Sequence, residues 1–187
     1  ADPIDVEFQR TKDETLRFKY GIPNQNQCKG CHERAKAMVP IGPTARQLNR
    51  AFAYGSGEEN QLAHWTRIGI LARAPATLDR APRNAVWNAP ATGSLEERAL
   101  AYLDANCAHC HNPEGPANTS GLYLTAGQTD PLRLGFCKVP VAAGNGAGDL
   151  KFGAVFGKPD ESILIRRLES VAPKIATLTP RVALTGD

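Results

Sequence analysis

Two copies of the pattern Cys-x-x-Cys-His constrain this chain more than any other feature of its sequence. The first copy, Cys-Lys-Gly-Cys-His, occupies residues 28–32, and the second, Cys-Ala-His-Cys-His, occupies residues 107–111. In this pattern two thiols bond to the vinyl groups of haem and the histidine that follows binds the iron. The sequence therefore predicts two haem c groups. The expected covalent attachment sites are Cys28, Cys31, Cys107 and Cys110, and the expected proximal iron ligands are His32 and His111.

Other uses of paired cysteines explain the two patterns less well. Cys-x-x-Cys also occurs in zinc sites and in redox dithiols. A four-thiolate zinc site would need both pairs to converge, and it would leave the adjacent histidines unexplained. The fifth cysteine, Cys137, is expected to be a small buried apolar residue rather than an iron ligand or a docking thiol.

The length and the low aromatic content predict two small domains, each built around its cofactor. The chain has 187 residues, of which 6% are aromatic, so side chains alone would give small cores. We expect a mainly α fold of two tandem helical haem domains with long irregular loops. The expected divisions are an N-terminal arm with a short strand at residues 1–22, a first haem domain at 23–93 and a second at 94–187.

Local patterns place the expected elements. Alternation of apolar and polar residues over 16–22 predicts a strand, whereas residues 1–15 show no periodicity and are expected to be an extended arm. Asparagines and glutamines at 24–27 can cap a helix that carries the first haem box. An amphipathic helix is expected over 60–71. Ser94 and Glu97 form a capping box for a helix that leads into Cys107, and a later helix begins near residue 163.

The distal ligand of the first iron has two candidates. Met38 lies six residues after His32, a short reach to the opposite face of the haem, whereas His64 lies on a separate expected helix. We favour His64. A methionine would raise the iron potential and a second histidine would keep it lower. A backbone carbonyl near Gly42 and Pro43 is expected either to accept the Nδ1–H of His32 or to belong to a plain turn.

Charge and hydropathy exclude several classes of partner. The formal net charge of +3 comes with no lysine-rich run and no basic, aromatic-interleaved stripe, so no nucleic-acid partner is expected. No apolar run is long enough for a transmembrane segment. A haem protein of this type matures outside the cytoplasm, so we expect an exported protein, periplasmic or at the cell surface, whose leader was removed. The glycine-rich residues 137–150 are expected to form a functional loop or a contact surface, without a phosphate-binding motif.

Several longer strings make the sequence resemble a bacterial family of dihaem c-type cytochromes. The resemblance covers about residues 20–180, and the strings lie at residues 23–32, 40–43, 48–50, 60–62, 102–104, 106–111 and 159–164. It implies two cytochrome c-like helical domains and an electron-transfer role, with the six cysteines and histidines of the two boxes in the attachment positions.

One departure from that family concerns the second iron. Family members typically have a Met-Pro pair after the last helix, and its methionine looks like the distal ligand. This chain has Ala-Thr-Leu-Thr-Pro at residues 176–180, and Met38 is its only methionine. The second iron is therefore expected to be five-coordinate, or to take a histidine from elsewhere in the chain or from a neighbouring subunit. His109 is a candidate ligand to another haem or subunit, although we favour a solvated or hydrogen-bonded residue of the box.

Two classes of function follow. In the first, the chain carries electrons between redox partner proteins, and in a variant of it copies of the chain stack into a multi-haem conduit. In the second, it is a dihaem redox enzyme of the peroxidase type with an open second haem. We favour the carrier, because no histidine or glutamate is clearly placed as a distal acid–base residue.

Overall fold

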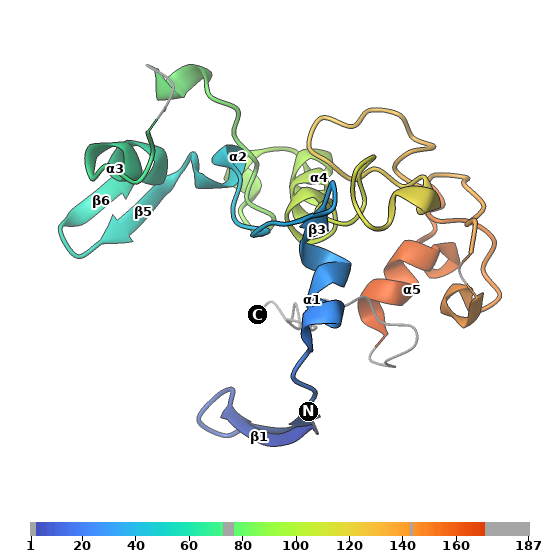
Figure 1. The fold of residues 1–187 in the computed structure, drawn as a ribbon. Helices are drawn as coiled ribbons and strands as arrows, with labels where there is room; N and C mark the ends of the chain where they lie inside the picture. The colour runs from blue at the N-terminus through green and yellow to red at the C-terminus, as the bar shows by residue number, and fades with distance from the viewer. Residues whose placement is uncertain (1–2, 73–76, 143, 171–187) are drawn as a thin grey trace. The chain divides into compact units, whose positions relative to one another are not determined.

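The computed structural model describes residues 3–72, 77–142 and 144–170 (Figure 1). The chain divides into two compact units, Ala1–Ile41 and Gly42–Asp187. Each unit is described by itself below. The domain boundaries at 22/23 and 93/94 stay predictions.

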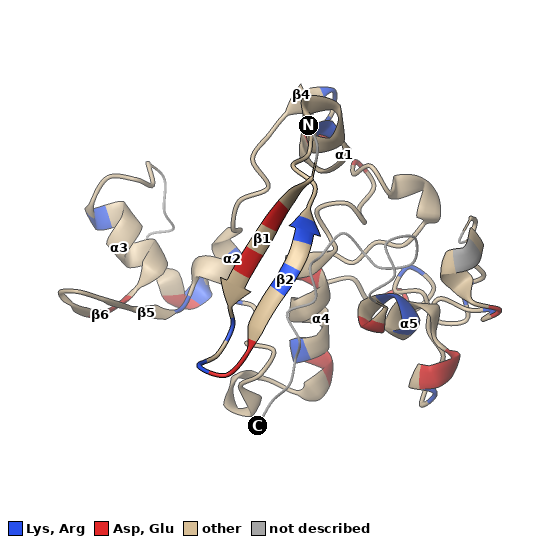
Figure 2. Cartoon of the chain, turned by 90° about the horizontal axis from the view of Figure 1, so that it is seen from below, with Lys and Arg blue, Asp and Glu red and all other residues tan. Residues whose placement is uncertain are grey.

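A two-stranded antiparallel hairpin opens the first unit. It pairs β1 (Ile4–Gln9) with β2 (Thr15–Tyr20). One face carries three apolar pairs across the strands, and the other carries charge pairs, because side chains alternate between the faces of a strand. Figure 2 shows acidic residues on β1 and basic residues on β2. The apolar pairs are Ile4 with Tyr20, Val6 with Phe18, and Phe8 with Leu16; the charge pairs are Asp5 with Lys19 and Glu7 with Arg17.

The hairpin confirms the strand expected from residue 16 and corrects the expectation for residues 1–15. Ile4, Val6 and Phe8 alternate with polar residues, so the period-2 signal of β1 is present in a segment that we expected to be an arm. The charged residues of β1 give the segment a polar composition, and this composition conceals the alternation of apolar and polar residues.

The first haem box lies on α1 (Gln25–His32), as expected. Asn24 and Gln27 form a reciprocal capping box at its start. A tight hairpin of β3 (Glu33–Arg34) and β4 (Ala37–Met38) follows at once. Its two turn residues, Ala35 and Lys36, have φ of 49° and 65°, the left-handed values that such two-residue turns require.

In the second unit a buried asparagine joins α2, the hairpin after it and a later loop. Asn49, only 6% exposed, donates to the carbonyl oxygens of Leu78 (3.3 Å) and Ala81 (2.9 Å) and accepts from Asn60 (2.9 Å). The Asn60 side chain in turn caps α3 by accepting from the Leu62 amide. The elements of this region are α2 (Ala45–Leu48), β5 (Ala51–Tyr54), β6 (Gly57–Asn60) and α3 (Gln61–Arg67).

The longest helix, α4 (Leu95–Asn106), delivers the chain to Cys107, and Ser94 and Glu97 form the expected capping box at its start. Near its end, Asp104 accepts from the Asn84 side chain (2.8 Å) and from the Ala126 amide (2.7 Å). After α4 the chain is mostly irregular up to α5 (Ile163–Glu169). Short 3-10 helices lie at Leu78–Arg80, Pro90–Thr92, Asn118–Ser120, Gly144–Ala147 and Pro159–Glu161.

The mainly α class is wrong. Among the described residues 33% are helical, mostly in short pieces, and 17% are in strands and bridges that form small antiparallel pairs. The 14 prolines and 17 glycines of the sequence interrupt helical periodicity, and the region between the second haem box and α5 is held by turns and by isolated bridges at Phe136 and Phe152. No described helix is long and apolar enough to cross a membrane.

Replacing Asn49 with alanine should destabilise the second unit by about 1–3 kcal/mol, because the Asn60 amide and two part-buried carbonyl groups would lose their partner. Denaturant unfolding monitored by circular dichroism measures the change. Arg50→Ala, at the exposed next residue, is the control and should stay within about 0.5 kcal/mol of the parent. Equal stability of the two variants would show that the Asn49 contacts contribute nothing.

Candidate haem-binding sites

The first box presents its three functional side chains along one side of α1. Cys28, Cys31 and His32 are spaced i, i+3 and i+4, which places them together on a helix. These three residues are half-buried, whereas the other residues of α1 are exposed. None of the five cysteines of the chain forms a disulfide.

A backbone carbonyl fixes the ring of His32. Its Nδ1 lies 3.1 Å from the carbonyl oxygen of Val39, and the Val39 amide donates to the His32 carbonyl at 2.8 Å. A carbonyl oxygen only accepts, so Nδ1 carries the hydrogen and Nε2 keeps its lone pair. The carbonyl that we expected at Gly42 or Pro43 is therefore that of Val39, because the β3–β4 hairpin turns the chain back onto His32 sooner than a Gly-Pro turn would.

Met38 is held next to the proximal histidine. It lies on β4, opposite Glu33, the residue that directly follows His32. Its side chain is 56% exposed. Its role as the alternative distal ligand of the first iron stays a prediction.

His64 lies on α3 in a cluster of polar and aromatic side chains. Its Nδ1 is 2.8 Å from Oε2 of Glu59, and its ring stacks on Tyr54 with 3.6 Å between centroids. Arg67 binds the same carboxylate through Nη2 at 2.6 Å. Hydrogen bonds from Arg67 and then from His64 lower the pKa of Glu59 to about 2.

Nη2 of Arg67 also lies 2.9 Å from Nδ1 of His64. Because a guanidinium only donates and a carboxylate only accepts, the two contacts at Nδ1 do not select one tautomer of His64. His64 and the first box belong to different units, so its role as the distal ligand of the first iron stays a prediction.

The second box follows directly on the end of α4. Cys107 is the C-cap residue, and its carbonyl accepts from the amides of Cys110 and His111 in the turn that follows. Burial raises the pKa of the Cys107 thiol. The pKa of His111 is lowered, first by burial and then by the charges of Arg167 and His109.

Hydrogen bonds around Ser120 fix the tautomer of His111. The Ser120 hydroxyl donates to the Ala117 carbonyl at 2.6 Å and accepts from the Leu122 amide at 3.2 Å. The hydroxyl hydrogen is thus used, and Nδ1 of His111, 3.2 Å away, must be the donor. Nε2 of His111 therefore keeps its lone pair, as Nε2 of His32 does. Nothing in the sequence pattern indicated Ser120.

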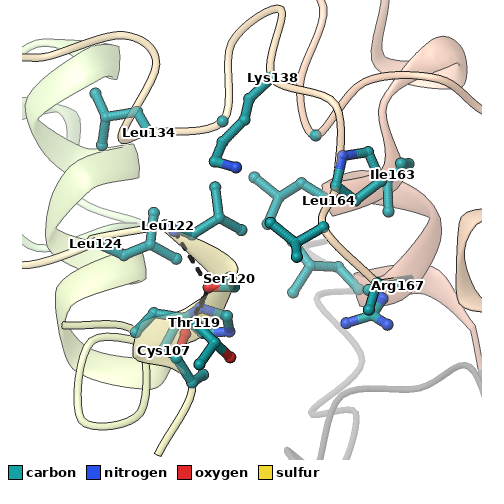
Figure 3. A pocket seen from close by; sticks show the side chains of 18 residues that line it. Cys107, Thr119, Ser120, Leu122, Leu124, Leu134, Lys138, Ile163, Leu164 and Arg167 are labelled. Atoms are coloured by element: carbon teal, nitrogen blue, oxygen red, sulfur yellow. Dashed lines mark hydrogen bonds between the residues drawn. The ribbon is translucent and has the colours of Figure 1, made fainter. Parts of the chain in front are cut away.

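His111 and Cys107 line an apolar cavity of about 310 Å³ (Figure 3), at the small end of the range for ligand pockets. Leucines from the segment after the box form one side and residues of α5 form the other. The apolar side chains of the lining are those of Ala117, Leu122, Leu124, Leu134, Pro140, Val141, Ala142, Ile163, Leu164 and Leu168.

Two cations complete the lining, and no aspartate or glutamate is among the described residues that form it. Lys138 reaches in toward Leu122 (Figure 3). Arg167 comes from α5, and its buried Nε has no hydrogen-bond partner in the described part of the chain. The cavity offers an apolar lining, a histidine nitrogen, an adjacent thiol and two cations, and its described lining holds no carboxylate. These features fit a haem, which is largely apolar and carries two carboxylates. The sequence predicts a helix that begins near residue 163 and indicates no role for Arg167.

The other predicted residues are placed as follows. His109 and Cys110 lie in the turn between Cys107 and His111 and are partly buried, and neither lines the cavity. The expectation that Cys137 is buried is wrong: it is exposed, at φ of 53° in a turn that directs it outward. Residues 176–180, which concern the missing Met-Pro pair, lie outside the described residues.

Changing Glu59 should alter the acid sensitivity of the second unit. A carboxylate with a folded pKa of about 2 instead of 4.5 stabilises the fold above pH 4.5, and this contribution is lost as the pH falls from 4.5 to 2. Glu59→Gln should therefore show a flatter dependence of thermal stability on pH in this window. Glu58→Gln, at the exposed neighbour, should behave like the parent. Identical pH profiles for the two variants would show that the contacts with Arg67 and His64 do not lower the pKa of Glu59.

Among the described residues, no group of three or more histidine, cysteine, aspartate or glutamate side chains could hold a metal ion. A haem iron does not need such a group, because its axial ligands approach singly from opposite faces. Comparison of the chain with protein-family models, with curated proteins and with solved structures finds no match.

Proposed function

We propose that the chain binds two haem c groups, one at each Cys-x-x-Cys-His box, and transfers electrons between redox partner proteins outside the cytoplasm. One observation carries the proposal: Cys107 and His111 share an apolar cavity, and Ser120 engages Nδ1 of His111, which leaves the lone pair of Nε2 available to an iron. Each haem would supply a one-electron iron couple.

The burial pattern supports a large apolar group in both units. No described residue of the first unit is buried, although it carries the apolar face of the β1–β2 hairpin and the first box. In the described part of the second unit only seven apolar residues are buried, and three of them are alanines. A cofactor bound at the boxes would bury apolar surface that the side chains leave exposed, and this would stabilise each unit.

The lining of the cavity favours a carrier over an enzyme. Apart from His111, the described lining residues include no histidine, aspartate or glutamate that could move a proton to or from a substrate. One observation favours the alternative, a dihaem redox enzyme of the peroxidase type: the same residues include no methionine and no second histidine, so an iron on His111 would have an open position.

The remaining parts of the proposal rest on the sequence. The strings around both boxes support membership of the dihaem c-type family, and covalent haem attachment supports a periplasmic or cell-surface protein. The partners are redox proteins, and further copies of the chain in the conduit variant. For such copies the exposed apolar face of the β1–β2 hairpin offers a contact surface.

Production of the chain in cells that mature c-type haem should give a protein carrying two covalent haems, counted by intact-mass spectrometry. The double variant Cys107→Ala/Cys110→Ala should carry one haem, because the second box loses both thioether bonds. Cys137→Ala, which removes the cysteine outside the boxes, should still carry two. A parent protein without covalent haem would refute the proposed function.

His64→Ala should convert the first haem from low spin to high spin, because the iron would lose its distal nitrogen. Magnetic circular dichroism and the reduced absorption spectrum report the change. Met38→Ala, the matched control, should leave the spectrum as it is. The reverse result, a change with Met38→Ala alone, would assign the ligand role to Met38.

The same spectra of the parent protein separate the carrier from the enzyme. High-spin signal from the second haem would support an open site, whereas two low-spin haems would eliminate the peroxidase-type alternative.

A further inference from the structure

Arg167 has a buried nitrogen without a partner. Its Nε is inaccessible to solvent and makes no hydrogen bond to any described residue. Leaving a buried donor of a charged group unpaired costs free energy, so such groups are normally paired in folded proteins. A guanidinium that lines a cavity with its buried Nε unpaired therefore points to an anionic ligand.

Glycine at position 146 makes room for this guanidinium. A Cβ there would lie 2.7 Å from Nη2 of Arg167, 3.2 Å from Nε and 3.3 Å from Cζ. The φ of Gly146 is not in the left-handed region, so space rather than backbone conformation requires glycine. The sequence predicts only a functional loop or a contact surface for the glycine-rich segment. The structure adds that its backbone at Gly146 packs against Arg167.

The neighbouring Arg166 shows that this environment is particular to one arginine. Arg166 lies against Gly148 and lines a separate polar hollow together with Asp160 and Glu169. It therefore has acidic residues nearby. Arg167 lines a cavity in which the described residues provide no carboxylate. The two arginines are adjacent on α5 and have the same charge, but only Arg167 faces the candidate haem site.

We propose that the Arg167 guanidinium binds a propionate carboxylate of the haem carried by the second box, and that Gly146 keeps the guanidinium in position for this contact. The inference rests on the proposed function. The planar guanidinium can donate two parallel hydrogen bonds to one carboxylate, which makes arginine well suited to this role. The contact would pair the buried Nε and neutralise a charge that the apolar cavity cannot solvate.

The test is a redox titration of the full chain, followed spectroscopically, for the parent, Arg167→Gln and Arg166→Gln. Removing the cation leaves an unneutralised carboxylate near the iron, which favours the oxidised state. In Arg167→Gln the equilibrium constant for reduction of one haem should fall by at least about threefold. This change lowers the potential of that haem by roughly 30 mV for a one-electron couple. Arg166→Gln removes the same charge from the same helix and should give a clearly smaller shift.

A second readout addresses the contact itself. The propionate bending bands in the resonance Raman spectrum should shift in Arg167→Gln and also in Gly146→Ala, which retains the charge but displaces the guanidinium. Arg167→Lys should restore most of the potential without restoring the parent bands, because an ammonium cannot reproduce the bidentate geometry.

The outcomes separate the two proposals. If mass spectrometry shows two haems but neither the potential nor the propionate bands respond to Arg167→Gln, the inference is refuted and the proposed function stands. Equal shifts in Arg166→Gln and Arg167→Gln would also refute it, because charge alone would then explain the effect. A parent chain that carries no haem refutes both.

Discussion

The hydrogen bond at Nδ1 of the histidine in each box determines what the other ring nitrogen can do. His32 donates to the Val39 carbonyl and His111 to the Ser120 hydroxyl. The two acceptors differ in chemistry, yet each leaves Nε2 with a lone pair. Both histidines are thus held in the tautomer that the proposed binding of a haem iron requires. The proposed function therefore depends on the short turns that follow each box.

The thin core is the second constraint, and it explains the irregular architecture. Long helices gain most of their stability by packing an apolar face against other elements, and the few buried side chains of this chain provide little such surface. Turns, buried amides such as Asn49, and helix caps hold much of the second unit instead. The largest apolar surface available to such a chain would be that of its cofactors, so their binding and the stability of the fold would be closely linked.

Local signals in the sequence predicted local structure well. The capping boxes at Asn24 and Ser94 and the helix that leads into Cys107 are present, because caps act within a single turn. The mainly α class was wrong because helix signals around the boxes were extended to segments where glycine and proline favour turns. Ser120 and Arg167 could not be identified, since their roles come from contacts with distant or irregular parts of the chain.

Both proximal histidines find their partners close by in sequence. Val39 lies seven residues after His32, and Ser120 lies nine residues after His111. Contacts over such short separations close small loops, which form quickly and with little loss of chain entropy. The segments 24–39 and 107–122 are therefore able to orient their histidines before the rest of each unit has folded. Under the proposed function, an enzyme that attaches haem to the still extended chain would meet both boxes in a shape close to their final one.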